Sequence, residues 1–182
     1  MKHRTLTPLL AVVALLLLTP GTTVADEDAE ETIAQASAAA PEFITKNATF
    51  MDRDGNVVRE GSNGWTCMPN TMPNDDAPMC NDEVWMKLLG AVGSKSDFET
   101  DRIGISYMLQ GDYGSGVSNS DPYHPDPKNA DDYVETGPHL MIVMPKMLLK
   151  GITDDPTKGG PYVMWKDTPY AHLMVPVADK QE

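Results

Sequence analysis

The sequence predicts an α+β fold, built as a single small domain with a mainly antiparallel sheet and one or two helices. Short apolar stretches of strand length recur along the chain, and Pro145, Pro161, Pro169 and Pro176 confine the ends of the later ones. Sustained helical spacing of large apolar residues is confined to one segment. The strand–helix–strand alternation typical of a parallel sheet does not occur. A chain of 182 residues also suits one domain.

Residues 1–25 predict a secretory signal peptide. Lys2 and Arg4 precede an apolar run from Leu9 to Leu18, and the small residues Thr23 and Ala25 suit cleavage before Asp26. The run of ten residues is too short for a spanning helix, which needs about 20. We therefore expect a periplasmic or secreted protein with no membrane attachment after cleavage.

The charge of the chain narrows the classes of partner. Fourteen basic and 27 acidic side chains give a net charge of -13, and loss of Lys2 and Arg4 with the signal peptide makes it -15. Nucleic-acid binding depends on lysine and arginine neutralising phosphates, so this charge argues against it, and likewise against anionic lipid. A small ligand, a cation or a periplasmic protein partner remains.

The mature chain begins with an acidic, alanine-rich segment, residues 26–42, that predicts an N-terminal helix or tail, and residues 43–182 form the expected globular domain. A hairpin is predicted by apolar residues 48–52, turn residues 53–56 and the β-branched stretch 57–60. Residues 61–80 are rich in Gly, Pro and Asn and predict an ordered loop.

A helix is predicted from Asn81, which suits the N-cap position, to Gly90 and Gly93, which favour its end. The residues at helical spacing are Val84, Trp85, Leu88, Leu89 and Val92. Further strands are predicted at residues 103–109, 139–144, 162–165 and 171–177. Between the first two, residues 110–138 form a long loop, which we expect to be solvated surface or a functional lid or recognition loop.

The two cysteines, Cys67 and Cys80, fall in the exported part of the chain. An oxidising compartment favours a disulfide between them. The pair alone makes a poor zinc site, because structural zinc usually takes four ligands with closer spacing. We therefore predict a disulfide, with free thiols and metal ligands as the alternatives.

Three long motifs resemble a family of exported bacterial proteins of unassigned function. They are NGWTCMPN at residues 63–70, GPHLMIVMP at residues 137–145 and GGPYVMWKDTPYAHLMVPV at residues 159–177. The resemblance spans nearly the whole mature chain. It implies export and the domain boundaries given above, and it implies no catalytic residues.

The tripeptide His-Leu-Met occurs twice, as His139 to Met141 and as His172 to Met174, each inside a predicted strand. Residues two apart on a strand point to one face. If the two strands are antiparallel neighbours, two imidazoles and two thioethers converge. Thioethers select Cu(I) over hard cations and imidazole accepts either copper state, so the sequence predicts a copper site at these four residues.

A second group of methionines, Met68, Met72 and Met79, lies between the two cysteines and predicts a weaker Cu(I) site on an exposed loop. The similarity to methionine-rich periplasmic copper proteins is one of composition only.

Other interpretations compete with copper. Methionine fills gaps in cores and buried histidine commonly bonds a carbonyl, which predicts core packing or a metal-free pocket near Trp165 and Tyr170 that binds a small molecule or a protein. An unrecognised small enzyme is the third alternative, with His139 or His172 paired to a carboxylate. The candidate carboxylates are Asp112, Asp121 and Asp167, and the spacing selects none of them. A binding protein therefore fits the sequence better than an enzyme.

Overall fold

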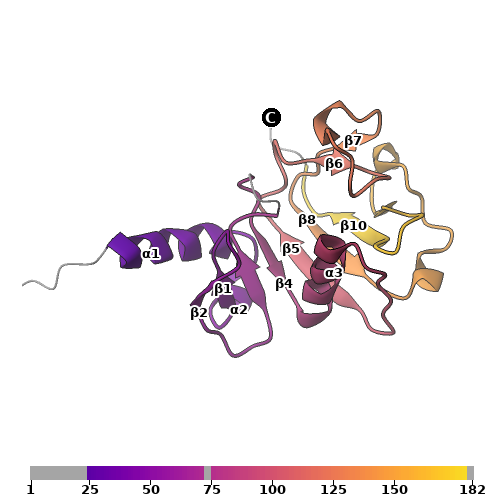
Figure 1. Cartoon of the computed structure of the whole chain (residues 1–182). Helices are drawn as coiled ribbons and strands as arrows, with labels where there is room; N and C mark the ends of the chain where they lie inside the picture. Colours follow the sequence, from indigo (N-terminus) through magenta and orange to yellow (C-terminus); the bar gives the residue numbers. More distant parts are fainter. Residues whose placement is uncertain (1–23, 72–74, 180–182) are drawn as a thin grey trace, which may run out of the picture.

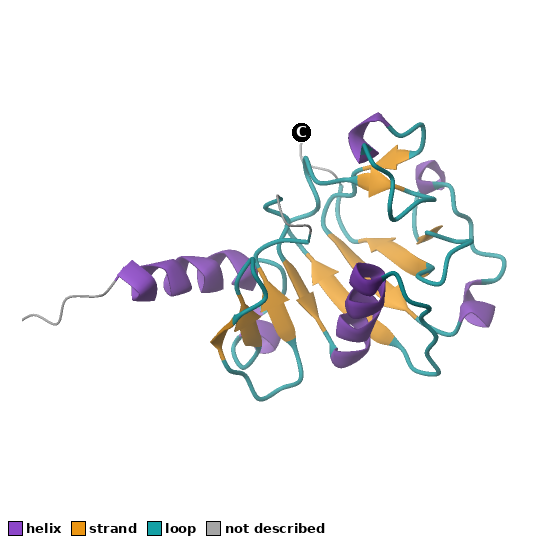
Figure 2. Cartoon of the chain, viewed as in Figure 1, coloured by secondary structure: helices purple, strands orange, loops and turns teal. Residues whose placement is uncertain are grey.

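The computed structural model describes residues 24–71 and 75–179. It is a single α+β domain whose main sheet has the order β2-β1-β3-β4-β5-β8-β10-β9 (Figures 1 and 2). The eight strands are β1 (Thr49–Met51), β2 (Val57–Arg59), β3 (Thr66–Met68), β4 (Met79–Asn81), β5 (Gly104–Met108), β8 (His139–Val143), β9 (Tyr162–Met164) and β10 (His172–Pro176). All neighbours are antiparallel except β1 and β3. The predicted fold class is confirmed.

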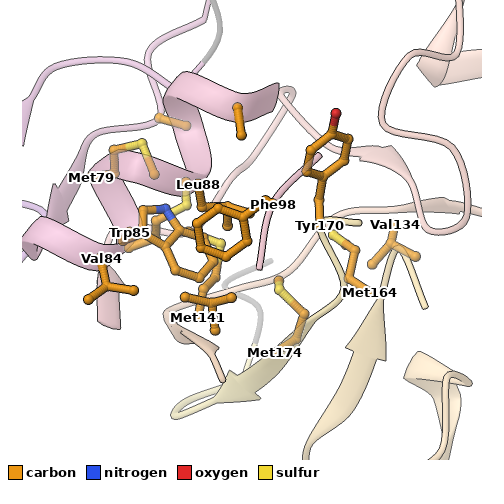
Figure 3. Packing of buried hydrophobic residues seen from close by; sticks show 14 of the residues in the cluster. Met79, Val84, Trp85, Leu88, Phe98, Val134, Met141, Met164, Tyr170 and Met174 are labelled. Carbon is orange, nitrogen blue, oxygen red and sulfur yellow. The ribbon is translucent and has the colours of Figure 1, made fainter. Parts of the chain in front are cut away.

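Helix α3 (Glu83–Ser94) covers one face of this sheet, as Figure 1 shows. Its residues Trp85 and Leu88 are buried in the main core beneath it (Figure 3). Gly104 on β5 permits the close contact, because a Cβ atom there would lie 2.8 Å from the Cβ of Val84. The helix is thus held directly against the central strands.

The predicted start of α3 is wrong by one residue. Asp82 is the N-cap, with Oδ1 accepting from the Trp85 amide at 2.8 Å, while Asn81 ends β4 and accepts a hydrogen bond from Ser106. Oδ2 of Asp82 also accepts from the Ile105 amide at 2.8 Å, so one carboxylate joins α3 to β5. Gly90 and Gly93 lie inside the helix, which ends at Ser94.

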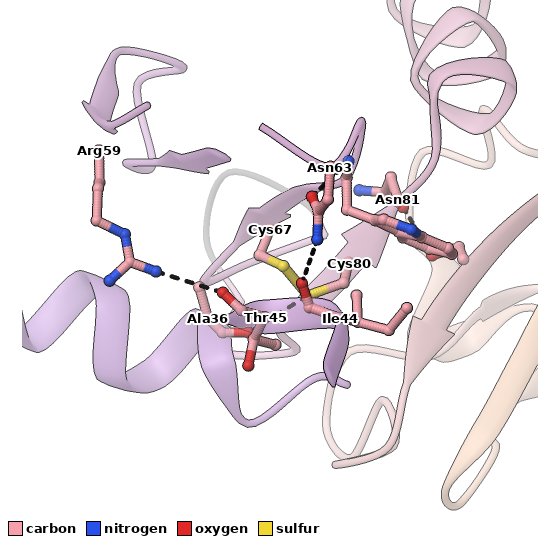
Figure 4. The surroundings of a disulfide bond; sticks show 10 residues. Ala36, Ile44, Thr45, Arg59, Asn63, Cys67, Cys80 and Asn81 are labelled. Carbon is pink, nitrogen blue, oxygen red and sulfur yellow. Dashed lines mark hydrogen bonds between the residues drawn. A yellow bond between two sulfur atoms is a disulfide. The ribbon is translucent and has the colours of Figure 1, made fainter. Parts of the chain in front are cut away.

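The opposite face carries the N-terminal helices α1 (Val24–Ser37) and α2 (Glu42–Thr45). The end of α1 and the residues after it pack closely, since Ala36 and Ala39 are fully buried together with Phe50. Beneath them the predicted disulfide between Cys67 and Cys80 is confirmed (Figure 4). It joins directly paired residues of β3 and β4, whose Cα atoms are 4.0 Å apart.

The two segments predicted as loops contain short strands. Residues 61–80 include β3 and β4, and residues 110–138 include the two-stranded sheet of β6 (Val117–Ser118) and β7 (Tyr133–Val134). Both segments are rich in glycine, proline and asparagine, a composition that favours loops and masks strands this short. Three 3-10 helices complete the described part of the chain: Pro127–Asn129, Lys146–Leu149 and Pro156–Lys158.

None of the helices within residues 24–71 and 75–179 has the length and apolar character needed to cross a membrane. The predicted signal peptide lies outside the described residues, apart from Val24 and Ala25 at the start of α1.

Candidate functional site

Within the described residues, the face of the sheet beneath α3 carries most of the histidine and methionine side chains, and we call it the donor face. Alternation along each strand places them there: in β8 and β10 the histidines and methionines are buried, while the leucines and isoleucine between them are half-buried on the other face. The tripeptides lie on adjacent antiparallel strands, in which Met141 is directly opposite Met174. The strand arrangement that the copper hypothesis needs is therefore present.

The register of the sheet arranges these donors in three rows across the strands. Met68 is opposite Met79, and Met108 is opposite His139. Continuing the pairing of β4 with β5 by one residue places Met79 opposite Met108. We call this set, Met68, Met79, Met108 and His139, the methionine row. The second row contains Met141 and Met174, and the third pairs His172 with Met164 on β9.

A cavity of about 220 Å³ lies over the donor face. The sheet contributes both histidines and five methionines, 79, 108, 141, 164 and 174. Helix α3 contributes Trp85, Leu88, Leu89 and Val92, and the segment 110–138 contributes Asp112, Ser115, Val117 and Pro122. The remaining lining residues are Thr71 and Trp165. Figure 3 shows Trp85 and Leu88 of α3 packed beside Met141 of the sheet.

Both histidines are held as neutral bases with a defined tautomer. Nδ1 of His139 lies 2.7 Å from the carbonyl oxygen of Gly137, and Nδ1 of His172 lies 2.9 Å from that of Tyr170. A carbonyl only accepts, so each Nδ1 carries the proton and each Nε2 carries the lone pair. Burial lowers the pKa of each imidazole to about 4, which keeps both neutral at pH 7.

His172 has the most restricted surroundings. Its ring meets Trp85 and Trp165 edge to face, each with ring centroids 5.2 Å apart, and its Nε2 is buried without a hydrogen-bond partner. Trp165 has a left-handed φ of 54° and is fixed to the segment before β7: its amide donates to Asn119 and its Nε1 donates to Ser118. The structure thus holds an unpaired acceptor between two fixed aromatic rings.

The register also separates the two imidazoles. His139 and His172 lie at opposite ends of the Met141 and Met174 pair, four residues apart along the strands, which corresponds to about 13 Å between their backbones. The four predicted ligands therefore share one cavity but divide into two half-sites. One contains His139 with Met108 and Met141, and the other contains His172 with Met164 and Met174.

The second predicted methionine group is not an exposed loop site. Met79 is buried in the cavity wall and Met68 is half-buried against the same core, while Met72 lies outside the described residues. Two donors that the sequence motifs do not single out, Met108 and Met164, line the cavity as well. The strand pairing that brings them there leaves no signal in the sequence.

The residues of the other hypotheses are distributed differently. Trp165 lines the cavity, whereas Tyr170 is buried beside it and pairs its hydroxyl with that of Tyr123 at 2.9 Å. The Tyr123 hydroxyl lies 2.8 Å from the carbonyl of Val92 at the end of α3, which fastens the 110–138 segment over the cavity. Of the three candidate carboxylates for an enzyme, Asp112 lines the cavity and accepts from the Thr136 amide. Asp121 and Asp167 are not among the lining residues.

Within the described residues, no three side chains from His, Cys, Asp and Glu gather into a group that could hold a metal. A metal in the cavity would need thioether ligands in addition to imidazole. Comparison of the chain with protein-family models, with curated proteins and with solved structures found no match.

Proposed function

We propose that this protein binds Cu(I) in the cavity over the donor face, as an exported, non-enzymatic copper-binding protein. The observation that carries the proposal is the state of His172, whose Nε2 lone pair is buried, unprotonated and unpaired beside thioethers. Metal-binding histidines commonly have their other ring nitrogen bonded to a carbonyl, as both histidines do.

The donor types favour the cuprous ion over other metals. Each half-site offers one neutral imidazole and two thioethers, a soft and uncharged set that suits Cu(I) and suits hard divalent cations poorly. The apolar cavity walls exclude water, which favours the monovalent ion over the more strongly hydrated Cu(II). The disulfide agrees with the oxidising compartment that export implies.

Anaerobic titration with Cu(I) against a competing chelator tests the proposal. The expected result is tight binding by the mature wild-type protein, reduced in the His139→Phe and His172→Phe variants, which keep a ring and lose the nitrogen donor. Met141→Leu with Met174→Leu tests the central thioethers at nearly constant volume. Circular dichroism confirms that each variant is folded.

Matched control variants remove the same types of donor side chain at positions outside the cavity. His124→Phe removes a histidine that does not line the cavity, and Met147→Leu removes a methionine that is 80% exposed. Neither should change the affinity. Failure of the wild-type protein to compete for Cu(I), or equal loss in the control variants, would overturn the proposal.

A second candidate function has one specific observation in its favour. Nε1 of Trp85 is a buried donor without a partner, and it belongs to the ring that contacts His172. A donor and an acceptor that are both unpaired in one cavity match a small molecule with a hydroxyl or amide group. Binding of such a compound with no affinity for Cu(I) would favour this alternative over copper.

A further inference from the structure

We propose that the methionine row is the path by which Cu(I) reaches the cavity. This inference rests on the proposed copper binding and adds the route of the ion to it. The row crosses four neighbouring strands, from Met68 on β3 through Met79 on β4 and Met108 on β5 to His139 on β8. It therefore connects one end of the donor face to the first half-site.

The exposure of the row falls from one end to the other. Met68 is half-buried, whereas Met79 and Met108 are 1% and 2% exposed and His139 is 1% exposed. Met79 and Met108 line the cavity, and Met68 packs against the same core from outside the lining. A metal ion that binds first at Met68 thus meets almost fully buried donors at every later position of the row.

The spacing of the row suits direct transfer between donors. Opposed residues in an antiparallel pair have Cβ atoms about 4.5 to 5.5 Å apart. Methionine has three rotatable side-chain bonds, so neighbouring sulfur atoms can hold one ion together during an exchange. Thr71 stands at this part of the cavity, with its Oγ1 3.9 Å from the Met108 sulfur.

Each transfer is a ligand exchange that needs no other reactant. The incoming thioether donates a lone pair to the ion, the departing thioether takes its own lone pair back, and copper stays in the +1 state. No proton moves, because thioethers are uncharged and His139 already has a free lone pair at Nε2. The ion reaches His139 without crossing the cavity as a bare charge, which would be costly in an apolar interior.

The experiment measures rates as well as affinity in the Met68→Leu variant. Cu(I) is delivered from a chelator complex in an anaerobic stopped-flow instrument, and the emission of Trp85 and Trp165, which both line the cavity, reports its arrival there. The reverse rate is measured by withdrawing copper with excess chelator. Leucine preserves the packing of Met68, and Met68 belongs to neither half-site.

We expect both rates to fall about tenfold in Met68→Leu, as a barrier higher by about 1.4 kcal/mol produces, with an unchanged dissociation constant. A residue on a path alters both rates equally, whereas a ligand of the resting site would alter the affinity. Met147→Leu, the matched control away from the row, should keep both rates.

Unchanged rates in Met68→Leu with wild-type affinity would overturn the path and leave the copper site standing. A larger dissociation constant in Met68→Leu would make Met68 a ligand of the final copper site and would also overturn the path. Absence of Cu(I) binding by the wild-type protein would overturn the proposed function and the path together. A second variant, Met79→Leu, should slow the same two rates, because Met79 is the next donor in the row.

Discussion

His139 and His172 are bases whose protonation the fold suppresses. Each donates through Nδ1 to a carbonyl two residues earlier in the chain, and burial favours the neutral ring. His172 also interacts electrostatically with His139, which further lowers its pKa because two positive rings in one cavity would repel. The lone pairs at Nε2 therefore remain available over a wide range of pH.

This property predicts an unusual pH dependence of copper affinity. A histidine ligand of ordinary pKa, about 6.5, loses affinity below that pH because the proton competes with the metal. With each pKa at about 4, affinity for Cu(I) should stay constant from pH 8 to about pH 5. Competition titrations across this range, corrected for protonation of the chelator, check the result. An affinity that falls between pH 6.5 and pH 5 would contradict the buried, neutral state.

The same pKa values predict that the protein loses stability in acid. Between pH 6.5 and about pH 4 the unfolded chain binds protons at both histidines and the folded chain does not, so the free energy of unfolding falls as pH falls. Each histidine should contribute about 3 kcal/mol to this loss. Urea unfolding at several pH values measures it. In His172→Phe the loss over this window should shrink by about half, and an unchanged loss would assign it to other groups.

At the scale of elements, the site depends on how α3 is attached to the sheet. The two oxygens of Asp82 accept from the amide of Trp85 in the helix and from that of Ile105 in β5. Trp85 in turn contacts His172, so the cap and the cavity wall are linked within one turn of helix. The Tyr123 hydroxyl holds the opposite side of the wall at the other end of α3.

We therefore expect Asp82→Ala to destabilise the protein by about 2 kcal/mol, since it removes a helix cap and leaves a second amide without its partner. Chemical denaturation gives the value. Glu83→Gln, one residue later, serves as the control, because its ion pairs with Lys87 and Arg102 are exposed and contribute little. Equal effects of the two substitutions would show that Asp82 is not the connection.

At the scale of the whole molecule, binding of Cu(I) should raise the melting temperature of the protein. The donor face is assembled from six strands, β3, β4, β5, β8, β9 and β10. The folded protein therefore binds the ion and the unfolded chain does not. At a free Cu(I) concentration 100 times the dissociation constant, the gain is about 2.7 kcal/mol, which raises Tm by roughly 5 to 10 °C for a domain of this size. Calorimetry under reducing, anaerobic conditions measures it, and the double variant His139→Phe with His172→Phe should show little shift.

The sequence predicts the parts of this molecule whose patterns are local. The helical spacing of Trp85 and Leu88, the hairpin of β1 and β2 and the strands with repeated His-Leu-Met all show periods within a few residues. The strands β3 and β6 lie in segments rich in glycine, proline and asparagine, a composition that predicts loops instead. Asn81 and Asp82 are both good capping residues, and tertiary contact with β5 selects the second.

The candidate site was predictable only in part, because its membership depends on pairing between distant strands. Spacing places His139 and Met141 on one face, and likewise His172 and Met174. The neighbours Met108 and Met164 enter through β5 and β9, which pair with β8 and β10. The separation of the two imidazoles follows from antiparallel register, which no single segment encodes.

Side chains alternate between the two faces of each strand, and this alternation determines how an error in strand register would affect the buried donors. On the other face of β5, β8 and β10, a half-buried row of directly paired apolar residues is formed by Ile105, Ile142 and Leu173. A slip of β8 by one residue would exchange its two faces, placing Leu140 and Ile142 in the cavity and turning His139 and Met141 outward. A chain with that error would keep a sheet and lose two of the six donors of the half-sites at once. Loss of Cu(I) affinity would therefore distinguish the slipped register from the correct one.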